Sequence, residues 1–244
     1  MSGEDDRRPL PHHCFCENCL RILAGSTIRR GCDSCGRPLP VVTSAIALPA
    51  GDETARRCSK CRQPGNDALL HWFCPLGKYA DVLRESVLAS KQRGYAPLAL
   101  GLGKLLGWKV WGEYQSLRGD DERIGAVTYI PSSWTRRLQR GGMPTQYLAE
   151  EVSRILRVPL YSLLRLTRRT RKQGMLSDAE RRENVRGAFA VRSSSRTPGG
   201  RILVVDDVWT TGSTIREAAE VLQREMGLVV CAAVVARAVG AHDR

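Results

Sequence analysis

The chain has 244 residues, 42% hydrophobic and 26% charged, which is enough apolar material for one large domain or two modest ones. No apolar run approaches the roughly 18 residues that span a bilayer, and the first thirteen residues are acidic and then basic, so we expect a cytoplasmic protein without a membrane partner. The net charge of +13 comes mainly from arginine, whose guanidinium group matches phosphate geometry, so both small phosphorylated ligands and nucleic acids suit this charge.

The N-terminal part of the chain is rich in cysteine. Three C-x2-C pairs occur there, at Cys16 and Cys19, at Cys32 and Cys35, and at Cys58 and Cys61. The two-residue spacing lets both thiolates of a pair face one tetrahedral zinc ion. The second and third pairs are separated as in a zinc ribbon, so we expect them to form one complete structural site. A small zinc-ribbon domain over residues 1–75 and a second domain over residues 76–244 follow from this clustering.

The first pair lacks a partner pair. Nearby residues that could complete a second zinc site are His12, His13, Cys14, His71 and Cys74. Whether the chain holds one zinc ion or two therefore stays open. A disulfide framework is the alternative, but it needs an oxidising compartment and normally a secretory signal, which the sequence does not indicate.

The elements that follow are helices first and then alternating strands and helices. Helical spacing covers residues 77–94 and 98–107, Lys91 lies near the end of the first helix, and residues 112–123 have the composition of a surface loop. Strands are expected at 124–131, 159–166, 200–207 and 228–239, with helices at 144–158 and 213–227. Such alternation predicts an α/β fold with a parallel sheet covered by helices on both faces, whose ligands bind at the carboxyl ends of the strands.

The strand at 200–207 ends in Asp206 and Asp207 and runs into a tract of hydroxylated residues around a glycine, Thr210–Thr214. Main-chain amides and hydroxyl groups of such a turn, at the positive end of a helix dipole, suit a phosphate group. Acids beside a phosphate must face something else, and ribose hydroxyls are natural donors for them. The alternative is an acidic strand end that only caps the turn. We also expect Thr214 and Glu217 to form a capping box at the start of the helix.

The segment "ILVVDDVWTTGST" resembles the phosphoribosyl-pyrophosphate (PRPP) motif of type I phosphoribosyltransferases. The chain as a whole is similar to the ComF family, in which an N-terminal zinc ribbon is joined to a transferase-type domain. The similarity also covers "LASKQRGYAPLA", "YIPSSWTRRLQRG" and "LTRRTRKQGMLSDAERRENVRGAF". It implies a type I phosphoribosyltransferase fold for the second domain.

The resemblance also implies roles for individual residues. Asp206 and Asp207 would hold the ribose hydroxyls and act as the catalytic acids, with Mg²⁺ bound together with PRPP. The 5′-phosphate would lie on Thr210, Thr211, Gly212, Ser213 and Thr214. The pyrophosphate side would be formed by Pro131 and Ser132, and Lys91 would be either a contact of this kind or a surface lysine. A mobile segment over the site would carry Arg168, Gln173, Arg181 and Asn184.

The function implied by the resemblance is PRPP binding, with phosphoribosyl transfer as the expected chemistry, in a protein linked to DNA uptake or DNA utilisation. Two alternatives remain open at this point. One is a PRPP or nucleotide sensor without turnover, and the other is a zinc protein that handles single-stranded DNA, alone or with a helicase of DNA uptake. Arginines around the cysteines suit phosphate backbones, but aromatic residues make up only 6% of the chain, so few bases could be stacked. The bulky Trp209 either lines the nucleobase side or packs.

Overall fold

The computed structural model describes residues 14–39, 56–63, 69–117, 123–132, 142–168, 178–192 and 199–239. Its centre is a four-stranded sheet in the order β1-β6-β5-β2, in which all neighbouring strands are parallel. Three strands lie where the sequence predicts them, namely β2 (Ile124–Tyr129), β5 (Arg201–Trp209) and β6 (Val230–Arg237). Their apolar residues are buried on both sides, as a parallel sheet requires. The predicted fold class, a parallel α/β sheet flanked by helices, is confirmed.

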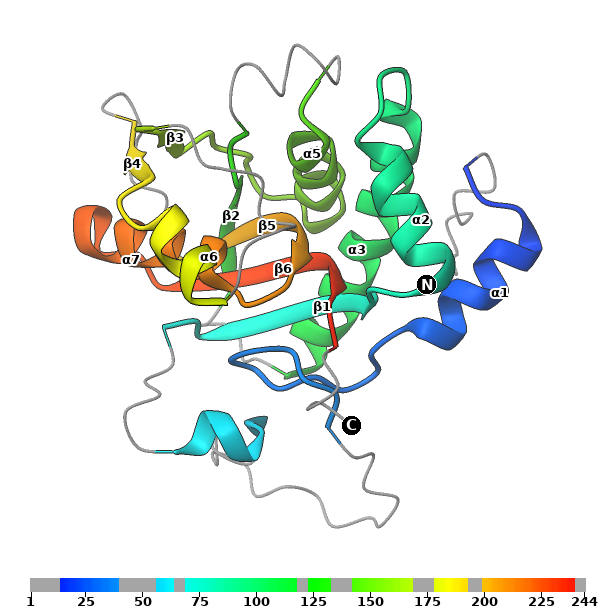
Figure 1. Cartoon of the computed structure of the whole chain (residues 1–244), viewed down its shortest axis with the longest axis horizontal. Coiled ribbons are helices and arrows are strands. Elements are labelled where there is room, and N and C mark those ends of the chain that lie inside the picture. The colour runs from blue at the N-terminus through cyan, green and yellow to red at the C-terminus, as the bar shows by residue number, and fades with distance from the viewer. Residues whose placement is uncertain are drawn as a thin grey trace, which may run out of the picture.

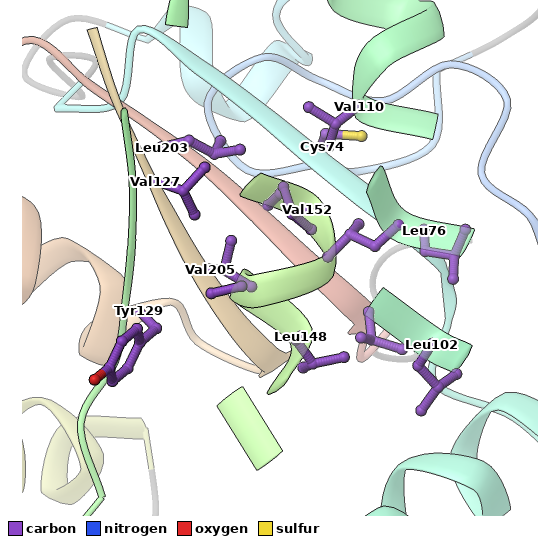
Figure 2. Packing of buried hydrophobic residues seen from close by; sticks show 14 of the residues in the cluster. Cys74, Leu76, Leu102, Val110, Val127, Tyr129, Leu148, Val152, Leu203 and Val205 are labelled. Atoms are coloured by element: carbon purple, nitrogen blue, oxygen red, sulfur yellow. The ribbon is translucent and has the colours of Figure 1, made fainter. Parts of the chain in front are cut away.

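Helices cover both faces of this sheet (Figure 1). Leu203 and Val205 of β5 face one side, which is covered by α1 (Glu17–Ser26), α2 (Asp81–Ser90), α3 (Ala96–Leu117) and α5 (Pro144–Leu156). The alternate residues Ile202 and Val204 face α7 (Ser213–Met226). Figure 2 shows the first side, where side chains of β2 and β5 meet those of α5. Among the described residues, no helix combines the length and apolar character needed to cross a bilayer.

The prediction of a surface loop at 112–123 is wrong for its first half, because α3 continues to Leu117. The reason is a buried stripe that recurs every four residues, at Leu102, Leu106, Val110 and Tyr114, each at most 5% exposed. This stripe faces the core and keeps the chain helical through the glycine and polar residues between its members. Residues 118–122 lie outside the described part of the chain.

The strand expected at 159–166 does not join the main sheet as a strand. Only one residue, Leu160, forms a bridge with Val127 of β2. Three residues later, the N–H of Leu163 donates to the side-chain hydroxyl of Thr128 (3.4 Å) instead of to a main-chain carbonyl. The chain then enters β3 (Leu164–Leu166), which pairs antiparallel with β4 (Phe189–Val191) in a separate two-stranded sheet. A short helix, α6 (Asp178–Val185), precedes β4.

The cysteine-rich segment is joined to the sheet through its edge strand β1 (Trp72–Lys78), which the sequence analysis did not foresee. The N–H of Ile28 donates to the carbonyl of Leu76 (3.2 Å), and the Lys109 amine of α3 donates to the carbonyl of Ile28 (2.6 Å). The expected boundary between residues 75 and 76 lies within β1. The division of the chain into two domains therefore stays a prediction.

Candidate functional site

Asp206 and Asp207 lie at the carboxyl end of β5, on opposite faces of the sheet, because side chains alternate along a strand. Asp206 is 8% exposed and lines a small hollow together with Trp209 and residues 212–215 of the following turn and helix. Its Oδ1 accepts a hydrogen bond from the Asp207 N–H (2.8 Å). Asp207 is half-buried and faces α2. The acid pair thus has one member inside the turn and one member beside a neighbouring helix.

Lys91 reaches this acid pair from the C-terminal end of α2. Its Nζ lies 2.7 Å from Oδ2 of Asp207, and both side chains are largely buried, at 25% and 18% exposure. An ion pair at this depth is screened less than a surface pair. The structure therefore brings Lys91 to the predicted site, where its amine neutralises Asp207.

Asp206 has an unusual proton affinity. Burial, and after it the negative charge of Asp207, raises the pKa of Asp206 to about 8, whereas hydrogen bonding from the Asp207 N–H and the charge of Lys91 act in the other direction. The carboxyl group is therefore mostly protonated near neutral pH in the folded protein. In the unfolded chain it loses its proton near its ordinary value of about 4.

The stability of the protein should therefore fall as pH rises from about 5 to 8. Over this window the folded state binds the Asp206 proton and the unfolded state does not, so this group can lower the free energy of unfolding by up to about 1.4 kcal/mol per pH unit. Asp206→Asn should remove this dependence. Urea unfolding of wild type and variant between pH 5 and 8 measures it, and parallel pH profiles of the two proteins would contradict the assignment.

The turn after β5 is shaped by Gly212. This residue has φ +79°, a left-handed conformation that disfavours other residues, and it precedes α7 as its N-terminal flanking residue. A Cβ at this position would lie 2.1 Å from Cζ2 of Trp209. The hydroxyls of Thr211 and Ser213 are hydrogen-bonded to each other (3.1 Å). First-turn amides, hydroxyl groups and the positive end of the helix dipole therefore gather at one place, as anion binding needs.

The expected capping box between Thr214 and Glu217 is wrong. The residue at the N-cap of α7 is Gly212, the hydroxyl of Thr211 accepts a hydrogen bond from the N–H of Ser213 (3.4 Å), and Oε1 of Glu217 accepts one from the N–H of Gly187 (2.6 Å). Glu217 bonds to Gly187 rather than to the first turn of its own helix because Gly187, at the turn before β4, lies beside α7. Glu217 thereby holds the two-stranded sheet against α7.

Pro131 and Ser132 follow β2, where the hydroxyl of Thr145 in α5 donates to the carbonyl of Ile130 (2.9 Å) and fixes the strand end. The Ser132 hydroxyl is buried and, among the described residues, meets no hydrogen-bond partner. A buried hydroxyl in this state favours a ligand or solvent contact. This agrees with the predicted role of the segment in ligand binding, which stays a prediction.

Of the four residues expected in the mobile segment, only Arg168 and Asn184 have described side chains. The guanidinium group of Arg168 donates to the carbonyls of Glu183 (3.2 Å) and Arg186 (2.7 Å) at the end of α6. Asn184 is half-buried on α6, the side chain of Arg181 lies outside the described part, and so does the whole of Gln173. Arg168 thus stabilises a helix end in this structure, and a role over the site stays a prediction.

Four cysteines of the N-terminal segment form one cluster. The Sγ atoms of Cys32, Cys35, Cys58 and Cys61 lie within 4.8 Å of one another, and those of Cys35 and Cys58 are 3.7 Å apart. With Zn–S bonds of about 2.3 Å, the edge of a tetrahedral site is about 3.8 Å. The cluster therefore fits the predicted structural zinc site in ligand type, number and spacing.

Neighbouring contacts support this cluster. The N–H of Cys58 donates to Sγ of Cys32 (3.2 Å), and an ion pair between Asp33 and Arg56 (2.9 Å) joins the two cysteine pairs. The hydrogen bond between the side chains of Cys32 and Cys35 lowers the pKa of Cys32 and raises that of Cys35 to about 11. The thiols therefore share protons, and a bound cation would let all four ionise.

Cys16 and Cys19 belong to no group of three or more potential ligands among the described residues. Cys16 is exposed at the start of α1, the thiol of Cys14 donates to the carbonyl of Pro97 (3.2 Å), and Cys74 is fully buried in β1 beside Glu113. Burial raises the pKa of the Cys74 thiol. His12 and His13 lie outside the described residues, so a second zinc site stays a prediction.

The acids and the turn lie inside a recognisable domain. Residues 139–243 match the phosphoribosyl transferase domain family. Over 218 residues the chain is 30% identical to the DNA utilization protein YhgH of Escherichia coli O157:H7, covering 88% of this chain and 86% of that protein. The chain belongs to the ComF/YhgH family. The family domain contains β5 and α7, and the four-cysteine cluster precedes it, as the resemblance to this family implies.

Two further comparisons cover less of the ComF/YhgH chain. Competence protein F of Haemophilus influenzae is 34% identical over 101 residues, which are 41% of this chain and 44% of that protein, so the match spans less than half of that relative. The orotate phosphoribosyltransferase of Aeropyrum pernix superposes with a TM-score of 0.31 at 24% identity, over 57% of this chain and 58% of that one. The latter likeness adds nothing to the sequence match.

Two residues near the site were not predicted from the sequence. Phe73 of β1 packs its ring against Trp209, with centroids 4.4 Å apart, and Arg237 at the end of β6 is 5% exposed and donates to the carbonyl of Cys35 (2.7 Å). The apolar and aromatic residues at 72–76 are the sequence signal for the edge strand, but His71 and Cys74 among them equally suit a metal site.

Proposed function

We propose that this protein binds PRPP or a closely related phosphoribosyl ligand at the carboxyl end of β5. The observation that carries this proposal is the position of Asp206 and Asp207 directly before the glycine turn that opens α7. The turn offers amides and hydroxyl groups to the 5′-phosphate, and the acids accept hydrogen bonds from ribose hydroxyls. Both halves of a ribose phosphate are thus matched by consecutive residues of the chain.

Magnesium is implied by the family and suits this donor set. The acids, together with the ligand's pyrophosphate and ribose oxygens, would hold the ion, and oxygen ligands of this kind are those that Mg²⁺ prefers. When bound, the ion supplies positive charge beside the acid pair. Lys91 supplies part of that charge in the structure described, through its 2.7 Å contact with Asp207. We therefore expect the Lys91 amine to change partner, from Asp207 to the ligand's phosphates, when the ligand binds.

Phosphoribosyl transfer is the reaction that such a site supports. As the bond between C1 and pyrophosphate breaks and an acceptor's nucleophile bonds to C1, positive charge develops on the sugar ring, and the carboxylate of Asp207, with Asp206 in its ionised form, stabilises it from the carboxyl end of β5. Arginines of the segment around Arg168 would neutralise the departing pyrophosphate. Trp209, which is 3% exposed, packs against Phe73 and lines the small hollow beside Asp206, which supports a packing role more than contact with a nucleobase. Ligand binding is therefore better supported than any particular acceptor, and release of pyrophosphate with added nucleobases or amines separates a transferase from a sensor.

The binding test compares substitution of the two acids with substitution of a third acid on α7, the helix that follows them. In calorimetric titrations of PRPP with Mg²⁺, we expect the wild type to bind and Asp206→Asn/Asp207→Asn to bind at least about 100-fold more weakly, since the carboxyl oxygens of both acids are lost as partners of the ribose and the ion. Glu220→Gln is the control, because Glu220 is an exposed acid on α7. Equal affinity of all three proteins would show that the acids do not hold the sugar.

Binding of single-stranded DNA is a second function, favoured by the exposed basic side chains of Arg29, Lys60 and Arg62 near the cysteine cluster and by the net charge of +13. Relatives named as a competence protein and as DNA utilization proteins support it, as would a helicase partner in DNA uptake. The affinity for an oligonucleotide should fall steeply with salt, and Arg29→Ala/Arg62→Ala should reduce the salt slope by about 2. A slope unchanged by these substitutions would exclude this surface.

A further inference from the structure

The turn that contains Cys32–Cys35, which we call the knuckle, accepts a hydrogen bond through its main chain from β6, the strand next to β5 and the candidate ligand site. Arg237, the last residue of β6, is 5% exposed and donates from Nε to the carbonyl of Cys35 (2.7 Å). In the sheet, Arg237 lies opposite Trp209 of β5, and the N–H of Ala238 donates to the carbonyl of Trp209 (2.8 Å). One hydrogen-bonded path thus leads from a cluster cysteine to the residue that opens the turn.

A second path consists of two buried aromatic rings, Phe73 and Trp209, which we call the aromatic bridge. Gly36, directly after Cys35, lies on the Phe73 ring so closely that a Cβ there would be 2.3 Å from Cε1. The Phe73 and Trp209 ring centroids are 4.4 Å apart, and both residues are at most 3% exposed. Trp209 in turn lies against Gly212, where a Cβ would be 2.1 Å from Cζ2.

The contacts at both ends of the aromatic bridge leave no space for adjustment. A glycine main chain touches a ring at each end, and the rings touch each other, so a shift of the knuckle displaces the rings toward or away from the turn. Packed interiors transmit such shifts because they resist compression. On the far side, the guanidinium group of Arg216 lies 5.9 Å from the Trp209 ring centroid, which connects the bridge to the first turns of α7.

We infer that metal binding at the four-cysteine cluster positions the phosphate-binding turn through Phe73, Trp209 and Arg237, so that the two sites are thermodynamically coupled. For its ligand this inference rests on the function proposed above. Zinc fixes the main chain of Cys32–Gly36 and therefore the rings that support Gly212. Coupling of this kind is reciprocal, so zinc should tighten PRPP binding and PRPP should tighten zinc binding by the same factor.

The first test measures PRPP affinity with Mg²⁺ in the whole 244-residue chain, loaded with zinc and after its removal, with circular dichroism as a check that the sheet stays folded. We expect at least about fivefold weaker binding without zinc. Phe73→Leu, loaded with zinc, should bind as weakly as the zinc-free wild type, whereas Phe189→Leu, the same change at another buried phenylalanine outside the bridge, should keep wild-type affinity. Equal affinity with and without zinc, or wild-type affinity of Phe73→Leu, would overturn the inference.

A second test does not depend on PRPP. Zinc removal should change the fluorescence of Trp209, seen as an emission change in the wild type that is reduced in Trp209→Phe. If the zinc-loaded wild type binds no PRPP, the proposed function fails, and this emission change still decides the coupling. An emission change of the same size in both proteins would mean that the metal does not reach the ring, and the inference would then fall.

Discussion

Replacing Cys58 with serine should remove the zinc ion from the cluster of Cys32, Cys35, Cys58 and Cys61 and unfold the segment that these residues hold. Among the described residues of this segment, the buried hydrophobic cluster consists of Cys32, Cys58 and Cys61, with Cys35 and Leu39 packed against it, so we expect the metal to take the place of a core. Structural zinc sites contribute on the order of 10 kcal/mol to folding in small peptides. Loss of one ligand therefore exceeds what the remaining contacts of the segment can compensate.

Mass spectrometry of metal content measures this prediction. Zinc should fall by about one ion per chain in Cys58→Ser, in line with a single four-thiolate site at these residues. Cys231→Ala is the matched control, because Cys231 is equally buried but lies in β6 away from the cluster. The same measurement on Cys16→Ser decides whether a second ion is bound. Full zinc content in Cys58→Ser would show that the four thiols are not the ligands.

Replacing Gly212 with alanine should weaken both the fold and ligand binding. The new Cβ would meet Trp209 at 2.1 Å, and φ +79° is unfavourable for alanine. A strained φ and an overpacked contact together cost roughly 2 to 4 kcal/mol. Because relief of this strain moves the turn, we expect at least about tenfold weaker PRPP binding, equivalent to about 1.4 kcal/mol. Urea unfolding and calorimetry measure the two effects.

Gly227→Ala provides the matched control for this substitution. Gly227 ends the same helix with φ +65°, but a Cβ there meets no atom within 4 Å. It therefore carries the cost of the left-handed conformation without the contact to the ring, and PRPP affinity should stay at the wild-type level. If both alanine variants bound PRPP like the wild type, the turn would not be the phosphate site.

Local patterns predicted much of this fold and site. The Val- and Ile-rich run of β5, the amphipathic stripe of α7 and the order of acids, hydroxyls and glycine are all set within one segment of the chain. The cysteine pairs Cys32–Cys35 and Cys58–Cys61 are likewise local patterns, because the two-residue spacing within each pair already predicts that both thiols face one metal ion. Family resemblance then supplied the assignment of the acids to ribose, which composition and periodicity alone leave open.

What the sequence did not predict depends on tertiary partners. Glu217 has the spacing of a capping box but bonds to Gly187, and Lys91 looks like a surface lysine at a helix end but pairs with Asp207. β1 was not predicted because its apolar run contains Cys74 and adjoins a cysteine-rich segment. Leu160 continues an apolar run, yet the sheet accepts only one bridge from it. In each case the local sequence is compatible with more than one structure, and a contact with a residue far away in the sequence determines which one forms.

The central claim is that the carboxyl end of β5 holds a ribose phosphate, rather than that a chain of net charge +13 attracts any polyanion. Competition calorimetry tests it most directly, with ribose 5-phosphate and pyrophosphate each added separately to the complex with PRPP and Mg²⁺. Ribose 5-phosphate carries both the hydroxyls for the acids and the phosphate for the turn, so it should displace PRPP, and Asp206→Asn/Asp207→Asn should weaken its binding. Displacement by pyrophosphate but not by a large excess of ribose 5-phosphate would contradict the account.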